Sequence, residues 1–242
     1  MDGVEDAYDI CPNTSFSELV DAKGCSVHSL VSLHHYDIIA GLSYGQRDQY
    51  TLQENDSYTA SLQLDYYYKN FNLQLNLSTY GFEEERGMND TILGAFYQYS
   101  LTQNFSLRLG ASLILPTYET GLNNEATDYA GSSELIYTLD KHSFFGGFSH
   151  TFVNDKDVDD IIYNDTNSFS LGYAHYFSSQ FYASGAYYYS DSIYQNIASI
   201  ENASAYMYYG IDEHLFITFS YALGLSDSAN DHYIGLRFGV YY

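Results

Sequence analysis

The chain has 242 residues, enough for one large β domain. Its 8 lysines and arginines against 31 aspartates and glutamates give a net charge of −23. This charge argues against nucleic-acid binding, since phosphates require cations, and it also disfavours anionic substrates. Apolar residues make up 45% of the chain, but no run approaches the ~18 residues of a membrane-spanning helix. No signal-peptide pattern follows Met1, so we expect a mature or truncated chain.

The N-terminal segment, residues 1–30, contains both cysteines of the chain, Cys11 and Cys25. Two cysteines close together in a small polar segment indicate a disulfide, and hence an oxidising compartment such as the periplasm. We therefore treat residues 1–30 as a separate periplasmic segment and residues 31–242 as the main domain.

Aspartates are the second feature of this segment. Asp2, Asp6 and Asp9 have the oxygen-rich spacing that calcium-binding loops use. The segment resembles part of a thrombospondin type 3-like calcium-binding repeat, of the kind that accompanies many bacterial outer-membrane proteins. The matching residues are Asp2-Gly3-Val4, Asp6, Asp9, Cys11-Pro12 and Gly24-Cys25. The resemblance implies calcium here, and we expect no other cofactor; the alternative is a solvated acidic linker with a disulfide.

Residues 57–81 show the clearest secondary-structure signal. Apolar and polar residues alternate on both sides of a tight turn at Lys69-Asn70. A period of two predicts strands, because successive side chains point to opposite faces of a sheet. Each arm is roughly 10–12 residues long, which exceeds an average strand and is close to the ~9–11 residues that cross a bilayer.

Similar alternation continues to the end of the chain and predicts twelve strands. They lie at 34–45, 56–68, 71–82, 91–101, 105–116, 128–139, 143–153, 167–177, 181–190, 200–209, 215–224 and 231–242. Short connections such as 69–70 and 102–104 alternate with longer ones such as 83–90, 117–127 and 154–166.

This alternation of loop lengths is typical of outer-membrane barrels, which have short periplasmic turns and longer extracellular loops. The predicted fold is an all-β, antiparallel up-and-down transmembrane barrel of about twelve strands, with both termini in the periplasm. Outer-membrane lipid is then a partner. The alternative, a soluble β-sandwich or lipocalin-like barrel, gives no reason for the regular difference in loop length.

The chain ends on Tyr241-Tyr242, and Tyr242 closes a row of alternating apolar residues. This resembles the C-terminal aromatic signature by which bacterial outer-membrane proteins are handed to the barrel-assembly machinery. The resemblance implies that this machinery is a partner through the last strand.

A second resemblance covers the middle of the chain, roughly Gly87–Asp155. Gly87-Met88-Asn89-Asp90-Thr91 and Leu113-Ile114-Leu115-Pro116-Thr117 resemble two segments of the family named for a MetA pathway of phenol degradation. Tyr118 and Asn89 stand where glycine is more usual. The resemblance implies an outer-membrane barrel that moves small, aromatic molecules.

Few charged residues are expected to face the inside of the barrel. They are Asp37, Asp65, Arg108, Glu134 and Arg237. Buried charges must pair, and neighbouring strands bring Arg237 near Asp37 and Arg108 toward Glu134. We expect these pairs to form a constriction near the periplasmic end, narrowed further by Tyr67, Tyr80 and Tyr233; the alternative is that the pairs only hold the lumen wall together.

These observations favour a narrow passive channel for small molecules, aromatic or hydrophobic, or for cations. One alternative is a non-conducting structural or adhesive surface barrel, which would use acidic loops such as Asp155–Asp160. We do not expect an enzyme: His142 and Ser143 are adjacent on a strand and point to opposite faces, and His150, considered with Asn154, has Phe152 rather than a serine two positions away.

Overall fold

The structure is a computed structural model that describes residues 34–48, 54–82, 85–118, 125–158 and 161–242. Its strands are β1 His34–Asp48, β2 Glu54–Tyr68, β3 Phe71–Phe82, β4 Glu85–Met88, β5 Thr91–Ser100, β6 Phe105–Leu115, β7 Asp128–Leu139, β8 His142–Phe152, β9 Thr166–Tyr176, β10 Phe181–Ser190, β11 Ile200–Gly210, β12 Leu215–Gly224 and β13 His232–Tyr241. The described residues include no helix long and apolar enough to cross a membrane. The predicted disulfide of Cys11 and Cys25 and the predicted calcium ligands Asp2, Asp6 and Asp9 lie outside these residues.

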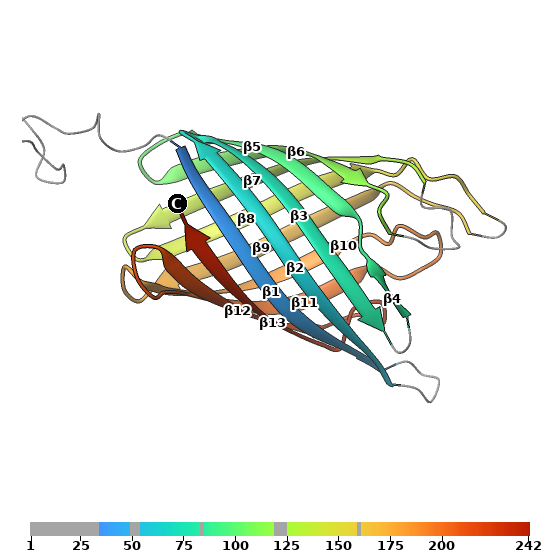
Figure 1. Ribbon diagram of the computed structural model, residues 1–242. Helices are drawn as coiled ribbons and strands as arrows, with labels where there is room; N and C mark the ends of the chain where they lie inside the picture. The colour runs from blue at the N-terminus through green and yellow to red at the C-terminus, as the bar shows by residue number, and fades with distance from the viewer. Residues whose placement is uncertain (1–33, 49–53, 83–84, 119–124, 159–160) are drawn as a thin grey trace, which may run out of the picture. The chain divides into compact units, whose positions relative to one another are not determined.

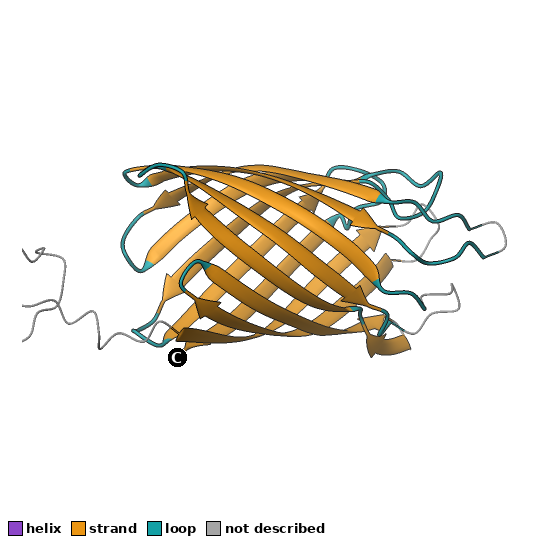
Figure 2. Ribbon diagram, turned by 90° about the horizontal axis from the view of Figure 1, so that it is seen from above, coloured by secondary structure: helices purple, strands orange, loops and turns teal. Residues whose placement is uncertain are grey.

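The strands form one antiparallel sheet that closes into a barrel (Figures 1 and 2). Apart from β4 and β5, which both pair with β3, strands that follow one another in the chain pair with one another. β1 closes the ring by pairing with β13 from Asp37↔Tyr241 to Gln46↔His232. The predicted up-and-down barrel of twelve strands is therefore confirmed, with one short strand added.

The added strand, β4, lies within residues 83–90, which we expected to be a loop. β3 pairs first with β5, at Asn76↔Ile92, and then with β4, at Thr79↔Met88. Between these two pairs β3 has two residues and the opposing chain has three, so the opposing chain contains a β-bulge. β4 and β5 thus share one position beside β3, and the barrel keeps twelve positions.

The bulge is held by the end of β6. The hydroxyls of Thr91 and Thr117 lie 3.0 Å apart, and Thr117 Oγ1 also donates to the carbonyl oxygen of Asn89 at 2.8 Å. The backbone N–H of Tyr118 donates to Asp90 Oδ1 at 3.0 Å. The two segments that carry the family resemblance, far apart in the sequence, therefore meet in one structural feature.

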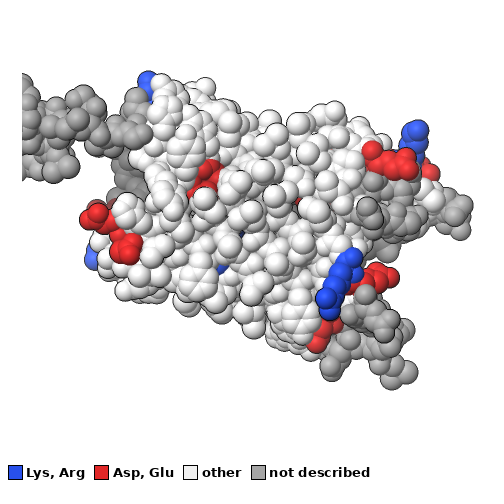
Figure 3. Space-filling view, viewed as in Figure 1, with Lys and Arg blue, Asp and Glu red and all other residues white. Residues whose placement is uncertain are grey.

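The two faces of the barrel differ in the way a membrane barrel requires. Large apolar side chains such as Leu42, Leu171 and Phe238 are 70%, 70% and 54% exposed on the outer face, whereas polar side chains, Asp65 and Thr218 among them, outnumber apolar ones among the buried residues. In Figure 3 the charged atoms gather at the two ends, and the belt between them is almost wholly uncharged. A soluble sandwich or lipocalin-like barrel would bury its apolar face, so that alternative is wrong.

The connections separate two ends, which we call the short-turn end and the long-loop end. The short-turn end holds the C-terminus and turns such as 69–70 and 140–141, and the long-loop end holds the C-terminal ends of β6 and β8, where the longer connections begin (Figure 1). Lys69 and Asp140 begin two-residue hairpin turns with φ of 54° and 51°. This left-handed conformation matches the twist of paired strands.

We predict that Thr91→Val, which keeps the shape of the side chain, lowers the free energy of unfolding by about 1–2 kcal/mol because it removes the hydroxyl that contacts Thr117. Urea unfolding of the folded protein in detergent measures this change. Thr79→Val, at an exposed position on the neighbouring β3, is the control and should have little effect. Equal losses in both variants would contradict the assigned role of Thr91.

Candidate functional site

The candidate site is the lumen near the short-turn end, and its centre is Asp65 on β2. The Asp65 side chain is 3% exposed. Its carboxylate accepts hydrogen bonds from the side-chain amides of Gln63 at 2.6 Å, Gln74 at 2.9 Å and Asn72 at 3.3 Å. All these residues lie at alternate, inward positions of the paired strands β2 and β3, which explains why a period-two sequence brings them together.

Two arginines reach this carboxylate through the amides. Arg237 donates from Nη2 to Gln63 Oε1, and Arg108 donates from Nη2 to Asn72 Oδ1 at 3.4 Å. Each guanidinium is therefore one amide away from Asp65. In a poorly solvated lumen, a carboxylate between two cations offsets part of the cost of removing all three charges from water. We call Asp65, Gln63, Asn72, Arg108 and Arg237 the lumen network.

Arg237 does not reach Asp37 in the way we expected. Closure of the barrel makes β1 and β13 neighbours, but the register places Arg237 opposite Gly41, and Asp37 lies opposite Tyr241. A glycine leaves room for the long arginine stem, since a Cβ at Gly41 would lie 2.6 Å from Arg237 Cγ. The guanidinium passes over this glycine to Gln63, and Asp37 stays 8% exposed beside β13.

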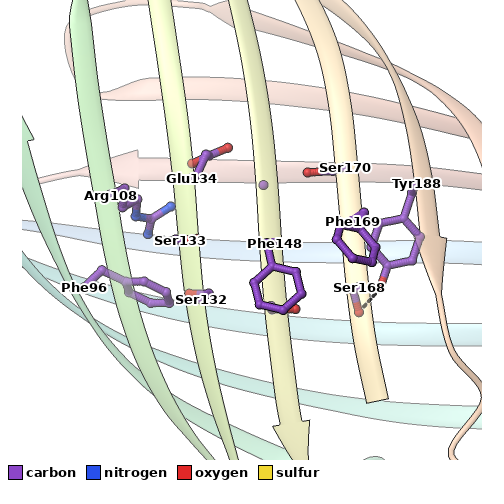
Figure 4. A pocket seen from close by; sticks show the side chains of 12 residues that line it. Phe96, Arg108, Ser132, Ser133, Glu134, Phe148, Ser168, Phe169, Ser170 and Tyr188 are labelled. Carbon is purple, nitrogen blue, oxygen red and sulfur yellow. Dashed lines mark hydrogen bonds between the residues drawn. The ribbon is translucent and has the colours of Figure 1, made fainter.

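Arg108 and Glu134 are direct cross-strand neighbours, as expected, on β6 and β7. Their side chains do not form an ion pair within the described part of the lumen, because the Arg108 guanidinium lies over the Phe96 ring, 4.2 Å from its centroid, and binds Asn72. Figure 4 shows Arg108, Phe96 and Glu134 on their neighbouring strands. Glu134 is consequently a half-buried carboxylate that faces the lumen, and no lysine or arginine of the described ranges pairs with it.

Two cavities meet at this point. One has a volume of about 210 Å³ and the other about 440 Å³, and Phe96, Arg108 and Glu134 line both of them. The smaller cavity is otherwise walled largely by serines of β7, β8 and β9, some of which Figure 4 labels. Water and small solutes therefore have space on both sides of the charged residues.

The opposite wall of the lumen, on β9–β13, is aromatic. The inward rings are Tyr176, Tyr182, Tyr206, Tyr208, Phe216 and Tyr241. Tyr182 stacks on Tyr208 at 5.3 Å, Phe216 stacks on Tyr241 at 4.6 Å, and the hydroxyls of Tyr208 and Tyr241 lie 2.7 Å apart. We did not predict this cluster, which we call the aromatic wall; the signal was the recurrence of tyrosine at alternate positions of the last strands.

Inward glycines let several rings lie flat against the barrel. A Cβ at Gly239 would lie 1.9 Å from the Phe216 ring, and one at Gly110 would lie 2.4 Å from Phe96. Only glycine permits so close an approach. Two rings that we expected to narrow the lumen, Tyr80 and Tyr233, likewise lie close to glycines, at Gly87 and Gly235.

Carboxylates at the long-loop end accept hydrogen bonds from N–H groups of their own loop and of neighbouring segments. Asp155 Oδ1 accepts from Glu125 at 3.1 Å and Ala126 at 3.0 Å, and Asp157 Oδ1 accepts from Tyr163. Asp191 accepts from the backbone and side-chain N–H groups of Asn167, which hold the pKa of its carboxyl below its usual value. No group of three His, Cys, Asp or Glu residues within the described ranges is placed to hold a metal ion.

The candidate catalytic residues lie apart, as the spacing predicted. Ser143 is 5% exposed, faces inward and lies 3.1 Å from the Thr138 hydroxyl. His142 faces outward, and its Nδ1 lies 2.6 Å from the hydroxyl of Tyr173. His150 contacts Asn167 rather than Asn154. No nucleophile–base pair forms from these residues.

Comparisons with solved structures find the same barrel in porins and in a translocator. The KdgM porin in complex with disordered oligogalacturonate has a TM-score of 0.56 and 13% identity, over 86% of this chain and 98% of that one. The NanC porin has a TM-score of 0.56 and 12% identity, over 85% and 98%. The translocator domain of autotransporter NalP from Neisseria meningitidis has a TM-score of 0.53 and 10% identity, over 89% and 90%.

Sequence comparison adds one finding. The family model described as "Putative MetA-pathway of phenol degradation" matches residues 27–241, almost the whole chain. No curated protein matches the sequence.

We predict that Asp65→Asn lowers the free energy of unfolding by about 1.5–3 kcal/mol, because it removes a charged acceptor and sets an amide N–H against three amide donors. Urea unfolding in detergent measures the loss. Asp140→Asn is the matched control, since Asp140 is exposed and asparagine tolerates its left-handed backbone. A decrease in the free energy of unfolding no larger than that of the control would contradict the central role of Asp65 in the network.

Proposed function

The chain belongs to the family described as "Putative MetA-pathway of phenol degradation", and on that premise we propose that it is a passive outer-membrane channel for small neutral, aromatic or cationic solutes. The observation that carries the proposal is the lumen itself. It has cavities on both sides of Arg108 and Glu134, a polar network on one wall and aromatic rings on the other.

The small diameter of the barrel supports the proposal that the solute is small. Twelve strands enclose a narrower space than the 16–18 strands of porins with open aqueous channels. The lumen network extends inward from β2, β3, β6 and β13, and it narrows the space near the short-turn end. Large solutes would have to break this network in order to pass.

The net charge of the lumen supports the passage of cations rather than anions. The inward charges that we predicted are three carboxylates, Asp37, Asp65 and Glu134, and two guanidiniums, Arg108 and Arg237, a net charge of 2 − 3 = −1. Glu134 in particular faces the lumen and forms no ion pair with any residue that the structure describes. The KdgM porin is in complex with disordered oligogalacturonate, and we propose a different class of solute for this chain.

The aromatic wall supports passage of neutral rings. Stacked tyrosines offer flat apolar faces, and their hydroxyls offer hydrogen bonds. A small planar molecule can slide along such a wall while ions follow the acidic side. No covalent step is part of this proposal, and the protein lowers only the barrier to diffusion.

We further propose that the short-turn end and both termini lie in the periplasm, and that the barrel-assembly machinery recognises the last strand. The difference in loop length between the two ends supports this orientation. The aromatic Tyr242 at the end of the apolar row supports the assembly signal.

Cysteine labelling tests the orientation. In a background without Cys11 and Cys25, Lys156→Cys in the long loop after β8 should react with a membrane-impermeant maleimide on intact cells. Ser179→Cys in the short turn after β9 should react only after the cells are lysed. The reverse pattern of labelling would invert the proposed orientation.

Conductance in a planar bilayer tests the channel. We expect a small conductance with cation selectivity, since the lumen is narrow and acidic. Arg237→Ala should raise both conductance and cation preference, because it removes a lumen cation and releases Gln63 from the network. Lys141→Ala, which removes an exposed cation at the same end, is the control and should leave the reversal potential unchanged.

Two results would contradict the proposal. Anion selectivity of the unmodified protein would show that the lumen carboxylates do not determine which ions the channel prefers. Silence in the bilayer, together with binding of the protein to cells or mineral surfaces, would favour the structural or adhesive barrel instead.

A further inference from the structure

Two histidines face each other on the outer surface of the barrel, at the short-turn end. His142, the first residue of β8, lies directly opposite His175, near the end of β9, and their ring centroids are 4.8 Å apart. The adjacent pair, Lys141 and Tyr176, is joined by a backbone hydrogen bond of 2.9 Å. Because hydrogen-bonded and non-hydrogen-bonded pairs alternate, the histidines form a non-hydrogen-bonded pair, the kind whose side chains lie closest.

The ring nitrogens are arranged for a ligand. Nδ1 of His142 lies 2.6 Å from the Tyr173 hydroxyl, which leaves Nε2 as the remaining nitrogen of that ring. A histidine held through one nitrogen while the other binds is the usual arrangement of a metal-ligating imidazole. Nδ1 of His175 is buried and has no hydrogen-bond partner among the described residues. A polar atom left in that state is costly, so a ligand that satisfies it is stabilised.

The spacing fits one metal ion between the two rings. An ion held by two imidazole nitrogens at ~2.0–2.1 Å keeps the ring centres about 5 Å apart, close to the distance found here. Imidazole suits zinc, nickel and copper rather than calcium or magnesium. The site lies beside the exposed turn that contains Lys141, so an aqueous ion can reach it.

We propose that His142 and His175 form a binding site for a divalent transition-metal ion of the zinc, nickel and copper class, and that Tyr173 is a positioning residue. Since no third protein ligand is placed nearby in the described ranges, water completes the coordination. The site is therefore open and exchangeable, unlike a closed structural zinc site. It joins β8 to β9 outside the lumen, and it does not depend on the proposed channel.

Calorimetric titration of the folded protein in detergent with Zn²⁺, and separately with Ni²⁺, tests the site. We expect His142→Ala and His175→Ala each to weaken binding at least tenfold. The double variant should bind no more weakly than either single variant, because one imidazole alone cannot chelate. Tyr173→Phe should weaken binding severalfold and keep the stoichiometry, because it loosens the His142 ring without removing a ligand.

The chain offers a matched control in His232. Its Nδ1 lies 2.9 Å from the Tyr221 hydroxyl, so it repeats the histidine–tyrosine contact on the outer surface. Its cross-strand partners are Gln46 and Leu223, and no second histidine faces it. His232→Ala should therefore bind metal like the unmodified protein. An equal loss in this control would show scattered surface binding and overturn the proposal.

The midpoint of thermal unfolding, measured with and without Zn²⁺, gives a second and independent test of metal binding. An ion that binds only the folded state raises the midpoint of thermal unfolding. Zn²⁺ should raise this midpoint in the unmodified protein and in His232→Ala, but not in the double variant. Metal affinity or a midpoint shift that is the same in the double variant and the unmodified protein would show that the two histidines form no site.

Discussion

The pairing of β1 with β13 is the interaction on which the rest of the structure depends. In the hydrocarbon part of a membrane, no water is available to satisfy backbone N–H and C=O groups, so a sheet can cross only if it has no free edges. The register from Asp37↔Tyr241 to Gln46↔His232 removes the last two edges. Once the ring is closed, every strand must turn its apolar residues outward and its polar residues inward, and the lumen acquires its charges as a consequence.

Enclosing charges in a narrow lumen creates a second constraint, which the amide side chains resolve. Asp65 is almost fully buried, yet neither arginine touches it directly. Gln63 and Asn72 each donate a hydrogen bond to the carboxylate and accept one from a guanidinium, so each amide links Asp65 to one of the two arginines. The network thus connects three charged groups without drawing the walls together, although Nε of Arg237 is buried and has no hydrogen-bond partner among the described residues. Space for solute therefore remains beside Glu134, where the cavities meet.

Glycine and threonine shape the wall around this network. Rings that would otherwise project into the lumen lie over glycines, as Phe216 does over Gly239, and so they line the wall. At the other end of the barrel, the hydroxyls of Thr91 and Thr117 hold a bulge in place. The segments that resemble the family are therefore explained by geometry, because they shape the rim where β6 leads into a long loop.

The sequence by itself determined the twelve long strands and their faces, because a period of two is a local property that any strand displays, but it did not reveal the short strand β4. It also determined that His142 and Ser143 point apart. Only the tertiary structure decided which inward groups bind one another. Arg237 selects Gln63, 174 positions away in the chain, rather than the expected Asp37, and Arg108 turns to Phe96 and Asn72 rather than to Glu134. These partners depend on the register of the strands and on the competition among several acceptors within reach of a long side chain. Neither can be deduced from the local alternation of apolar and polar residues.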